Sequence, residues 1–307
     1  MSLQFDLTAY PVRDVLDLLL KDKTMKRNIV FGTDSYTELG ADYTPEAQMT
    51  KKALLAMDAR AIQPRVMKGA AEQLERTRKK AEVFTPLWIC AKMNDFRDEQ
   101  WFGRPCVFGN PVGTAWVPNP DKVVFTQCLH WQDYVRDKVL EITCGEAPFL
   151  VSRYDAATGE DVPIPERIGI LDRKLRVVGE NTNNEAEWQT WALKAFRSVY
   201  GYEWQGDNLL IGRVNLLLTY TEYVREKWGH DPDAKALKDI ANTIAWNLWQ
   251  MNGLTGSVPY VERPVRTVQM SFLNMFGEQP VLTEPVPCRI MDWSDLKKSI
   301  EFNSLGR

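Results

Sequence analysis

Two short apolar segments that each end near a glutamate constrain the fold of this chain most strongly. Residues 138–143 (Lys-Val-Leu-Glu-Ile-Thr) run into Cys144-Gly145, and residues 199–203 (Val-Tyr-Gly-Tyr-Glu) end in an acid. Segments with helical spacing lie between them and after them. This alternation around two acidic strand ends, Glu141 and Glu203, predicts an α/β sheet.

The spacing of apolar residues predicts the other elements of the chain. We expect helices over residues 12–20, 66–80, 87–93, 185–198, 207–228 and 237–249, with the last one running on into a strand as an alternative. Thr85-Pro86 is typical of a helix start, and Asp207 is a plausible cap. Residues 155–159 resemble a turn, and residues 168–178 are rich in β-formers, so a hairpin insertion is expected over about 151–184.

The composition is that of an ordinary globular protein. The 307 residues are 44% hydrophobic and 26% charged, and no apolar run approaches the length of a membrane span. Residues 1–10 lack the pattern of a secretory signal. The five cysteines are scattered without a Cys-x-x-Cys pair, which argues against a zinc site and against a disulfide framework. We therefore expect a cytoplasmic protein.

Basic residues are concentrated between residues 51 and 80, although the formal net charge of the chain is -3. Such a run is consistent with a solvated helix face, and it is also consistent with a surface that contacts DNA phosphates. The candidates for DNA contact are Arg76, Arg78, Lys79 and Lys80, because they lie nearest to the motifs described below.

Residues 140–150 (Leu-Glu-Ile-Thr-Cys-Gly-Glu-Ala-Pro-Phe-Leu) resemble motif I of the amino-methyltransferases, in which an acid and Pro precede Gly-x-Gly-x-Phe/Leu. Glu141, Gly145 and Phe149 match that pattern. Ile142 stands where Pro is usual, and Ala147 stands where the second Gly is usual. An alanine there is costly if the backbone needs a positive φ.

Three further segments follow the order of the same family. Residues 81–86 (Ala-Glu-Val-Phe-Thr-Pro) are similar to motif X, which packs over the methionine part of the cofactor. Residues 199–208 resemble motif II, where Glu203 would accept hydrogen bonds from ribose hydroxyls. Asn252-Gly253-Leu254 is similar to motif III, where Asn252 would accept from the adenine amine. A glycine-capped helix end explains that last segment as well.

The resemblance covers roughly residues 75–255, and it points to the adenine-N6 DNA methyltransferases of restriction–modification systems. The chain is also similar to short proteins described as restriction endonuclease subunit M, which share the segments Lys-Ala-Glu-Val-Phe-Thr-Pro and Leu-Glu-Ile-Thr-Cys-Gly-Glu-Ala-Pro. The resemblance implies a Rossmann-like class I fold over residues 66–260, with irregular additions at residues 1–65 and 261–307. It also implies S-adenosylmethionine as cofactor, bound by Phe84, Thr85, Pro86, Glu141, Gly145, Phe149, Glu203 and Asn252.

The catalytic motif IV of that family, Asn/Asp/Ser-Pro-Pro followed by an aromatic residue, has no clear counterpart here. Ser257-Val-Pro-Tyr260 comes nearest, and an ordinary loop explains it equally well. If the resemblance holds, Ser257 would hold the amino group of a flipped adenine, and Tyr260 would stack on the base.

Two other functions remain open from the sequence. The chain could be a non-catalytic subunit that binds cofactor or DNA while a restriction or specificity subunit supplies catalysis. It could also be a Mg²⁺-dependent nuclease, because Asp155, Asp161 and Asp172-Arg-Lys174 imitate the acid and acid-x-Lys pattern of restriction nucleases. The first interpretation, a methyltransferase acting on double-stranded DNA, requires an intact cofactor site.

Overall fold

A parallel sheet lies at the centre of the fold. The computed structural model describes residues 5–58, 61–80, 82, 85–126, 128–265, 282–294 and 298–305. Three strands lie in the order β5 (Val139–Glu141), β6 (Val199–Glu203) and β7 (Leu248–Gln250). Val139 pairs with Val199, and Gly201 pairs with Leu248. The predicted mixed α/β class is confirmed.

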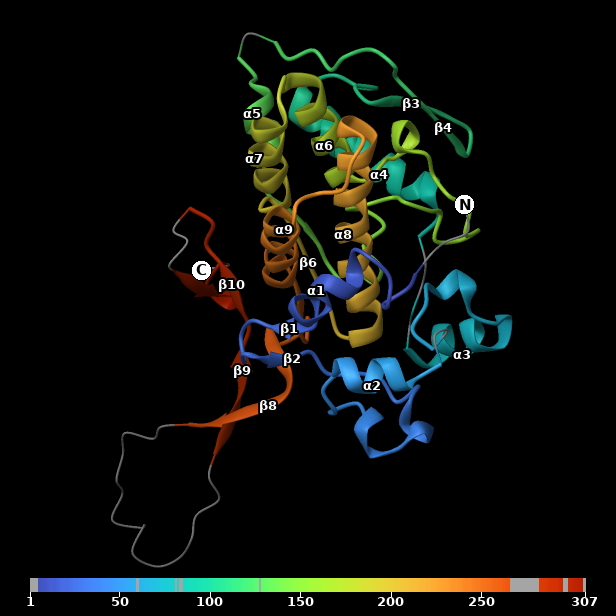
Figure 1. Ribbon diagram of the computed structural model, residues 1–307, viewed down its shortest axis with the longest axis vertical. Coiled ribbons are helices and arrows are strands. Elements are labelled where there is room, and N and C mark those ends of the chain that lie inside the picture. The colour runs from blue at the N-terminus through green and yellow to red at the C-terminus, as the bar shows by residue number, and fades with distance from the viewer. Residues whose placement is uncertain are drawn as a thin grey trace, which may run out of the picture.

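Helices connect the three strands and cover one face of the sheet (Figure 1). The chain passes from β5 to β6 through α6 (Ile170–Asn181) and α7 (Glu185–Phe196), and from β6 to β7 through α8 (Gly206–Trp228) and α9 (Ala234–Asn247). Parallel neighbours require such crossovers. Val199 and Leu248 point from the sheet into the main core, where α8 and α9 also bury their apolar residues.

The opposite face of β6 and β7 is covered by the C-terminal segment. There β8 (Ser257–Pro264) pairs antiparallel with β9 (Thr283–Pro287), β10 (Arg289–Met291) pairs with β11 (Ser299–Glu301), and η6 (Phe302–Ser304) follows. Tyr200 and Trp249 each lie one residue beyond Val199 and Leu248, so their side chains point to this second face. They form a smaller core with residues of the C-terminal segment, including Ile290.

The N-terminal segment packs around the start of α8. It contains α1 (Val12–Leu19), the short pair β1 (Lys21–Asp22) and β2 (Arg27–Asn28), then η1 (Thr37–Leu39), η2 (Ala41–Tyr43), α2 (Lys51–Ala56), η3 (Arg65–Met67) and α3 (Ala70–Lys80). A Cβ atom on Gly206 would lie 2.0 Å from the Val30 carbonyl oxygen, so only glycine permits this close approach.

The remaining elements lie around α6 and the far end of α8 (Figure 1). They are α4 (Leu87–Phe102), the hairpin of β3 (Gly109–Val112) and β4 (Ala115–Pro118), α5 (Trp131–Arg136) and η4 (Ile164–Glu166). No helix within the described residues combines the length and apolar character that crossing a membrane requires.

Several sequence predictions are confirmed and three differ from the structure. Strand 199–203 and the helix that runs into a strand near residue 248 are as predicted. The β-rich segment 168–178 is instead the helix α6, because Ile170, Leu171, Leu175, Val177 and Val178 are all buried at helical spacing in the main core. The predicted hairpin is reduced to one bridge between Tyr154 and Asp161. The helix predicted over 66–80 is interrupted before α3.

Candidate functional site at the carboxyl edge of the sheet

The loop after β5 has an unusual backbone. Thr143, Gly145 and Ala147 have φ values of 47°, 52° and 64°, so every second residue adopts a left-handed conformation. Ala147 therefore occupies the strained geometry that the family pattern reserves for glycine, and it does so fully buried. Strained backbone of this kind persists only where the surroundings enforce it, and it is concentrated at functional sites.

Two close approaches enforce the shape of this loop. A Cβ atom on Gly201 of β6 would lie 3.0 Å from Cys144 Sγ, and one on Gly212 of α8 would lie 3.0 Å from the Gly145 carbonyl oxygen. The Cys144 N–H donates to the Tyr202 carbonyl oxygen at 2.9 Å. The loop is thus clamped between the end of β6 and the first turns of α8.

Glu203, at the end of β6, binds the loop directly. The Gly145 N–H donates to Glu203 Oε2 at 2.9 Å, and the N–H groups of Trp204 and Gln205 donate to Oε1 at 2.9 and 3.0 Å. Burial raises the pKa of Glu203, and the three backbone donors oppose that shift. Oε1 has both lone pairs engaged, whereas Oε2 keeps one that can accept a ligand hydroxyl.

Glu141, at the end of β5, lies in a more apolar environment. It is 8% exposed, the Phe149 N–H donates to its Oε1 at 3.4 Å, and its Oε2 has no hydrogen-bond partner among the described residues. Burial raises the pKa of Glu141 to about 8, assisted by the nearby charge of Glu203. A raised pKa of this kind favours the protonated form of Glu141 at neutral pH.

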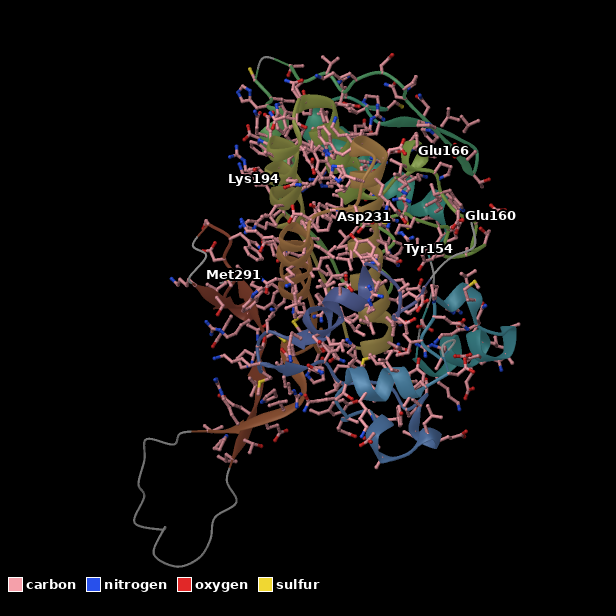
Figure 2. All side chains as sticks on the ribbon, in the orientation of Figure 1. Tyr154, Glu160, Glu166, Lys194, Asp231 and Met291 are labelled. Carbon is pink, nitrogen blue, oxygen red and sulfur yellow. The ribbon has the colours of Figure 1, made fainter. Side chains whose placement is uncertain are left out.

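Glu146 anchors the other side of the same loop. The Arg65 N–H donates to its Oε1 at 2.7 Å, and the Tyr154 hydroxyl donates to its Oε2 (Figure 2 labels Tyr154). Burial raises the pKa of Glu146 to about 7. Since this glutamate is enclosed by its partners, we assign it to holding the loop.

An open cavity of about 370 Å³ adjoins the end of β6. Trp204 and Gln205 form one side, Gly32, Thr33, Asp34 and Pro45 of the N-terminal segment form another, and Tyr260 of β8 completes it. The rings of Trp204 and Tyr260 meet edge to face, with centroids 5.2 Å apart. Tyr260 has a φ of 56° and is 45% exposed. The cavity thus has aromatic surface on two sides, and it lies next to the end of β6, where Glu203 is the residue before Trp204.

A buried charged cluster lies behind this edge. Arg76 donates to Glu82 Oε2 at 2.7 Å and contacts Asp207 Oδ2 at 2.9 Å, while the Tyr36 hydroxyl donates to Asp207 at 2.8 Å. Lys68 lies 3.8 Å from Asp207. The positive charge of Arg76 lowers the pKa of Asp207 although burial opposes it. The prediction that Arg76 contacts DNA is therefore corrected, because this side chain is buried and paired with carboxylates.

The neighbouring DNA candidates have different environments. Arg78 and Lys79 are exposed, and Lys79 pairs with Glu75 at 2.6 Å one turn earlier in α3. The side chain of Lys80 lies outside the described residues. Asp207, expected to cap α8, lies inside its first turn instead, and Gln205 is the capping residue.

The helix that follows the motif X-like segment, α4, contacts the chain after β5. Pro86 is the capping residue of α4, and Thr85 precedes it. Asn94 of α4 donates to the carbonyl oxygens of Phe149 and Ile168, both at 3.0 Å. Phe149 itself packs against Cys90 and Ile168 and so has a structural role. Phe84 lies outside the described residues.

The remaining candidates are less accessible than expected. The side chain of Asn252 accepts from the Leu254 N–H at 3.0 Å and so closes its own turn. Ser257 is 5% exposed, and its hydroxyl pairs with that of Thr255 at 2.6 Å. The expectation that Ser257 holds an adenine amine is corrected, because the hydroxyl is buried and bonded. Only Tyr260 of the motif IV candidates borders the cavity.

The nuclease pattern is not assembled. Asp172, Arg173 and Lys174 belong to the helix α6, and all three are buried. Lys174 donates to Ser198 Oγ at 2.6 Å, so it is not free to polarise a water. Among the residues that the structure describes, no group of three or more His, Cys, Asp or Glu could hold a metal ion.

The aromatic cavity was not predicted from the sequence. Trp204 and Gln205 directly follow the predicted acidic strand end, so their position was a usable signal, whereas the contributions of Gly32 and Asp34 come from a segment without any motif.

Comparisons of this chain with protein-family models, with curated proteins and with solved structures give no match.

Proposed function

We propose that the chain is an S-adenosylmethionine-binding, methyltransferase-like subunit that acts on adenine in double-stranded DNA within a restriction–modification or phage-defence system. The observation that carries the proposal is the pairing at the sheet edge. Glu203 holds the strained loop after β5 through the Gly145 N–H at 2.9 Å, and the next two residues, Trp204 and Gln205, line the aromatic cavity.

The strand arrangement supports a Rossmann-like interpretation. Read from β7 through β6 to β5, the sheet has the order 3-2-1, which is one half of a doubly wound dinucleotide-binding sheet. Helical crossovers join its strands, and the acids stand at their carboxyl ends. Ligands of such sheets bind in the crevice outside these ends.

The residues present fit the adenosyl part of the cofactor. The remaining lone pair of Glu203 Oε2 would accept one ribose hydroxyl, and Trp204 would stack on the adenine ring. The cavity volume of about 370 Å³ falls within the range of small-molecule sites. When bound, S-adenosylmethionine supplies an electrophilic methyl group. The chain would position it and exclude water through the Trp204–Tyr260 aromatic pair.

A second candidate is a non-catalytic cofactor- or DNA-binding subunit. It is favoured by Ser257, whose buried and bonded hydroxyl leaves no accessible polar group at the motif IV position. In that case a partner restriction or specificity subunit would supply the target-base contacts. Arg78 and Lys79 on the exposed side of α3 are the DNA contacts proposed for either version. A cytoplasmic location belongs to the same proposal.

The test is calorimetric titration of S-adenosylmethionine into the purified chain and into Glu203→Ala and Trp204→Ala. We expect saturable binding that both substitutions weaken by about tenfold or more. Trp246→Ala, which removes a half-buried tryptophan from α9, is the matched control and should bind as the parent does. An unchanged affinity in Trp204→Ala, or no binding to the parent chain, would refute the proposal.

A transfer assay separates the two versions. Radiolabelled methyl groups are followed from the cofactor to duplex DNA, with and without adenine in the duplex. Transfer that depends on adenine supports the methyltransferase. Binding of the cofactor without transfer supports the non-catalytic subunit.

A further inference from the structure

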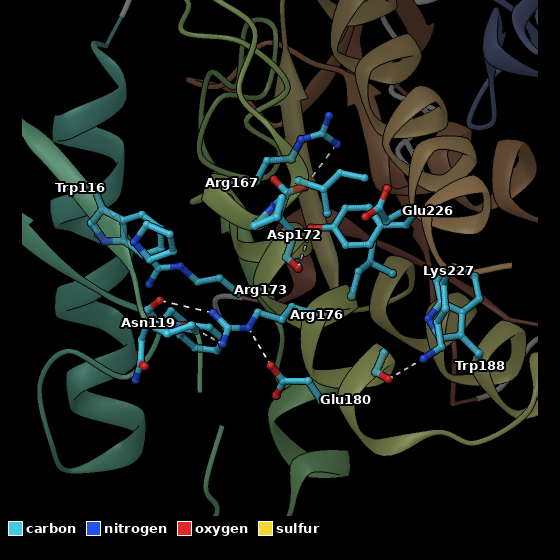
Figure 3. A pocket seen from close by; sticks show the side chains of 18 residues that line it. Trp116, Asn119, Arg167, Asp172, Arg173, Arg176, Glu180, Trp188, Glu226 and Lys227 are labelled. Carbon is cyan, nitrogen blue, oxygen red and sulfur yellow. Dashed lines mark hydrogen bonds and ion pairs between the residues drawn. The ribbon is translucent and has the colours of Figure 1, made fainter. Parts of the chain in front are cut away.

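A second cavity lies at the opposite end of α8 from the sheet edge. It has a volume of about 430 Å³ and lies between the β3–β4 hairpin with its following loop, α6, and the last turns of α8 (Figure 3). Tyr223, on its wall, is 17 residues after Gly206 in a single helix. At 1.5 Å per residue, the cavity is roughly 25 Å from the carboxyl edge of the sheet. It is therefore separate from the proposed cofactor site.

Aromatic side chains form much of the wall. Trp116, Trp188 and Tyr223 come from β4, α7 and α8, and Phe108 directly precedes β3; of these four, Trp116 alone is half-buried and the others are buried. The guanidinium of Arg173 lies 5.2 Å from the centroid of Phe108 and 5.6 Å from that of Trp116. Surfaces of this kind accept a flat ring, because a planar π-system can stack on the aromatic and guanidinium faces.

Two charged residues that line the cavity, Asp172 and Arg167, each keep one buried polar atom without a hydrogen bond. Asp172 uses Oδ2 to accept from the Ser152 N–H at 2.9 Å, which leaves its Oδ1 without a hydrogen bond. Arg167 donates from Nε and Nη2 to Val162 and Glu222, which leaves its Nη1 without one. These two atoms are 3.9 Å apart, and both side chains are more than nine-tenths buried.

These two atoms form an ion pair that is too long for a hydrogen bond, so both keep an unused hydrogen-bonding capacity, and this arrangement favours a ligand that bonds to both. The matching group is a planar edge with an N–H donor beside a ring nitrogen or carbonyl acceptor. The N–H would donate to Asp172 Oδ1, and the acceptor would receive the Arg167 Nη1–H. Such an edge is the hydrogen-bonding edge of a nucleobase.

The charges around the mouth favour a neutral ligand. Arg176 donates to Glu180 Oε1 at 2.7 Å, and Lys227 donates to the Gly179 carbonyl oxygen at 2.7 Å (Figure 3). These cations are therefore engaged within the chain, and a phosphate group would find them already paired. A nucleoside fits this balance better than a nucleotide.

We propose that this cavity binds a nucleobase, with its polar edge on Asp172 and Arg167 and its face against Trp116. Since Asp172 Oδ1 and Arg167 Nη1 are covered, binding includes a shift of the Arg167 side chain that opens both atoms to the cavity and keeps Nη1 directed at the ligand; Arg167 stands on the short connection between η4 and α6. The proposal does not rest on the cofactor site.

The probes are adenosine, guanosine, cytidine and uridine, titrated separately into the full chain by calorimetry and by tryptophan fluorescence. At least one nucleoside should bind saturably. Trp116→Ala should weaken that binding by about tenfold or more, since one stacking partner is lost. Asp172→Asn should weaken it similarly, because the amide that replaces the acid cannot keep both acceptors. Trp131→Ala, a half-buried tryptophan of α5 outside the cavity, is the control and should leave affinity within about twofold.

Two further readouts keep the result unambiguous. Thermal unfolding checks that Trp116→Ala folds, so that the conclusion does not depend on Asp172→Asn. Trp204→Ala distinguishes the two sites, because adenosine bound at the sheet edge would be lost in that variant and kept in Trp116→Ala. Absence of saturable binding at millimolar nucleoside, or binding that Trp116→Ala leaves unchanged, would overturn the proposal.

Discussion

Replacing Glu141 with glutamine should make the chain more stable at alkaline pH than the parent. The pKa of Glu141 in the folded chain is about 8, against an ordinary value of 4.5, chiefly because the carboxyl is buried. The parent chain must therefore keep this group protonated at neutral pH, or bury a charge above pH 8. Glutamine has a similar shape and no charge to bury.

The sign and size of the effect follow from proton linkage. A raised folded-state pKa means that folding takes up a proton, so the contribution of Glu141 is fully favourable below about pH 4.5 and is lost as the pH rises to about 8. Each pH unit in that window is worth about 1.4 kcal/mol. Between about pH 5 and pH 9, the stability of Glu141→Gln relative to the parent should therefore increase by roughly 4 kcal/mol.

Urea unfolding, followed by tryptophan fluorescence at several pH values, measures this difference directly. Glu160→Gln is the matched control, because Glu160 is exposed on the outer surface (Figure 2), so the same chemical change there removes no buried carboxyl group. A Glu141→Gln curve parallel to that of the parent across the whole range would refute the argument. It would mean that Glu141 is ionised in the folded chain.

Three further substitutions test the structural assignments by thermal or chemical unfolding. Arg76→Met should destabilise the chain by about 3–5 kcal/mol, because it leaves buried carboxylates unpaired. The control, Arg78→Met on the exposed side of α3, should change the free energy of unfolding by no more than about 0.5 kcal/mol. Similar values for both variants would contradict the buried cluster. Ala147→Gly should stabilise by up to about 1 kcal/mol, since it relieves a φ of 64°, and a loss of stability would mean that the loop is unstrained. Gly206→Ala places a methyl group 2.0 Å from the Val30 carbonyl oxygen, so it should loosen the packing of the N-terminal segment and increase its cleavage in limited proteolysis. Unchanged protease resistance would show that this close approach is not needed.

Local patterns in the sequence predicted much of the sheet region. The apolar segments that end in Glu141 and Glu203 became parallel neighbouring strands, and the long helices after residues 185 and 207 formed where apolar spacing placed them. These features depend on residues close together in the chain, so periodicity reports them. The sequence also predicted strain at Ala147 if the backbone there has a positive φ. That prediction concerns the backbone of a single residue, so the local sequence was sufficient to make it.

Tertiary structure alone decided which charged residues are available. Arg76 lies in a run of basic residues that looks like a solvated face, yet it is enclosed by Glu82, which is close in sequence, and by Asp207 and Asn208 from a distant part of the chain. Residues 168–178 have strand-forming side chains, yet burial on several sides makes them a helix. The cavity beside Asp172 joins residues from four separate segments. Burial and long-range pairing depend on contacts between segments far apart in the sequence, and a single sequence carries no record of those contacts.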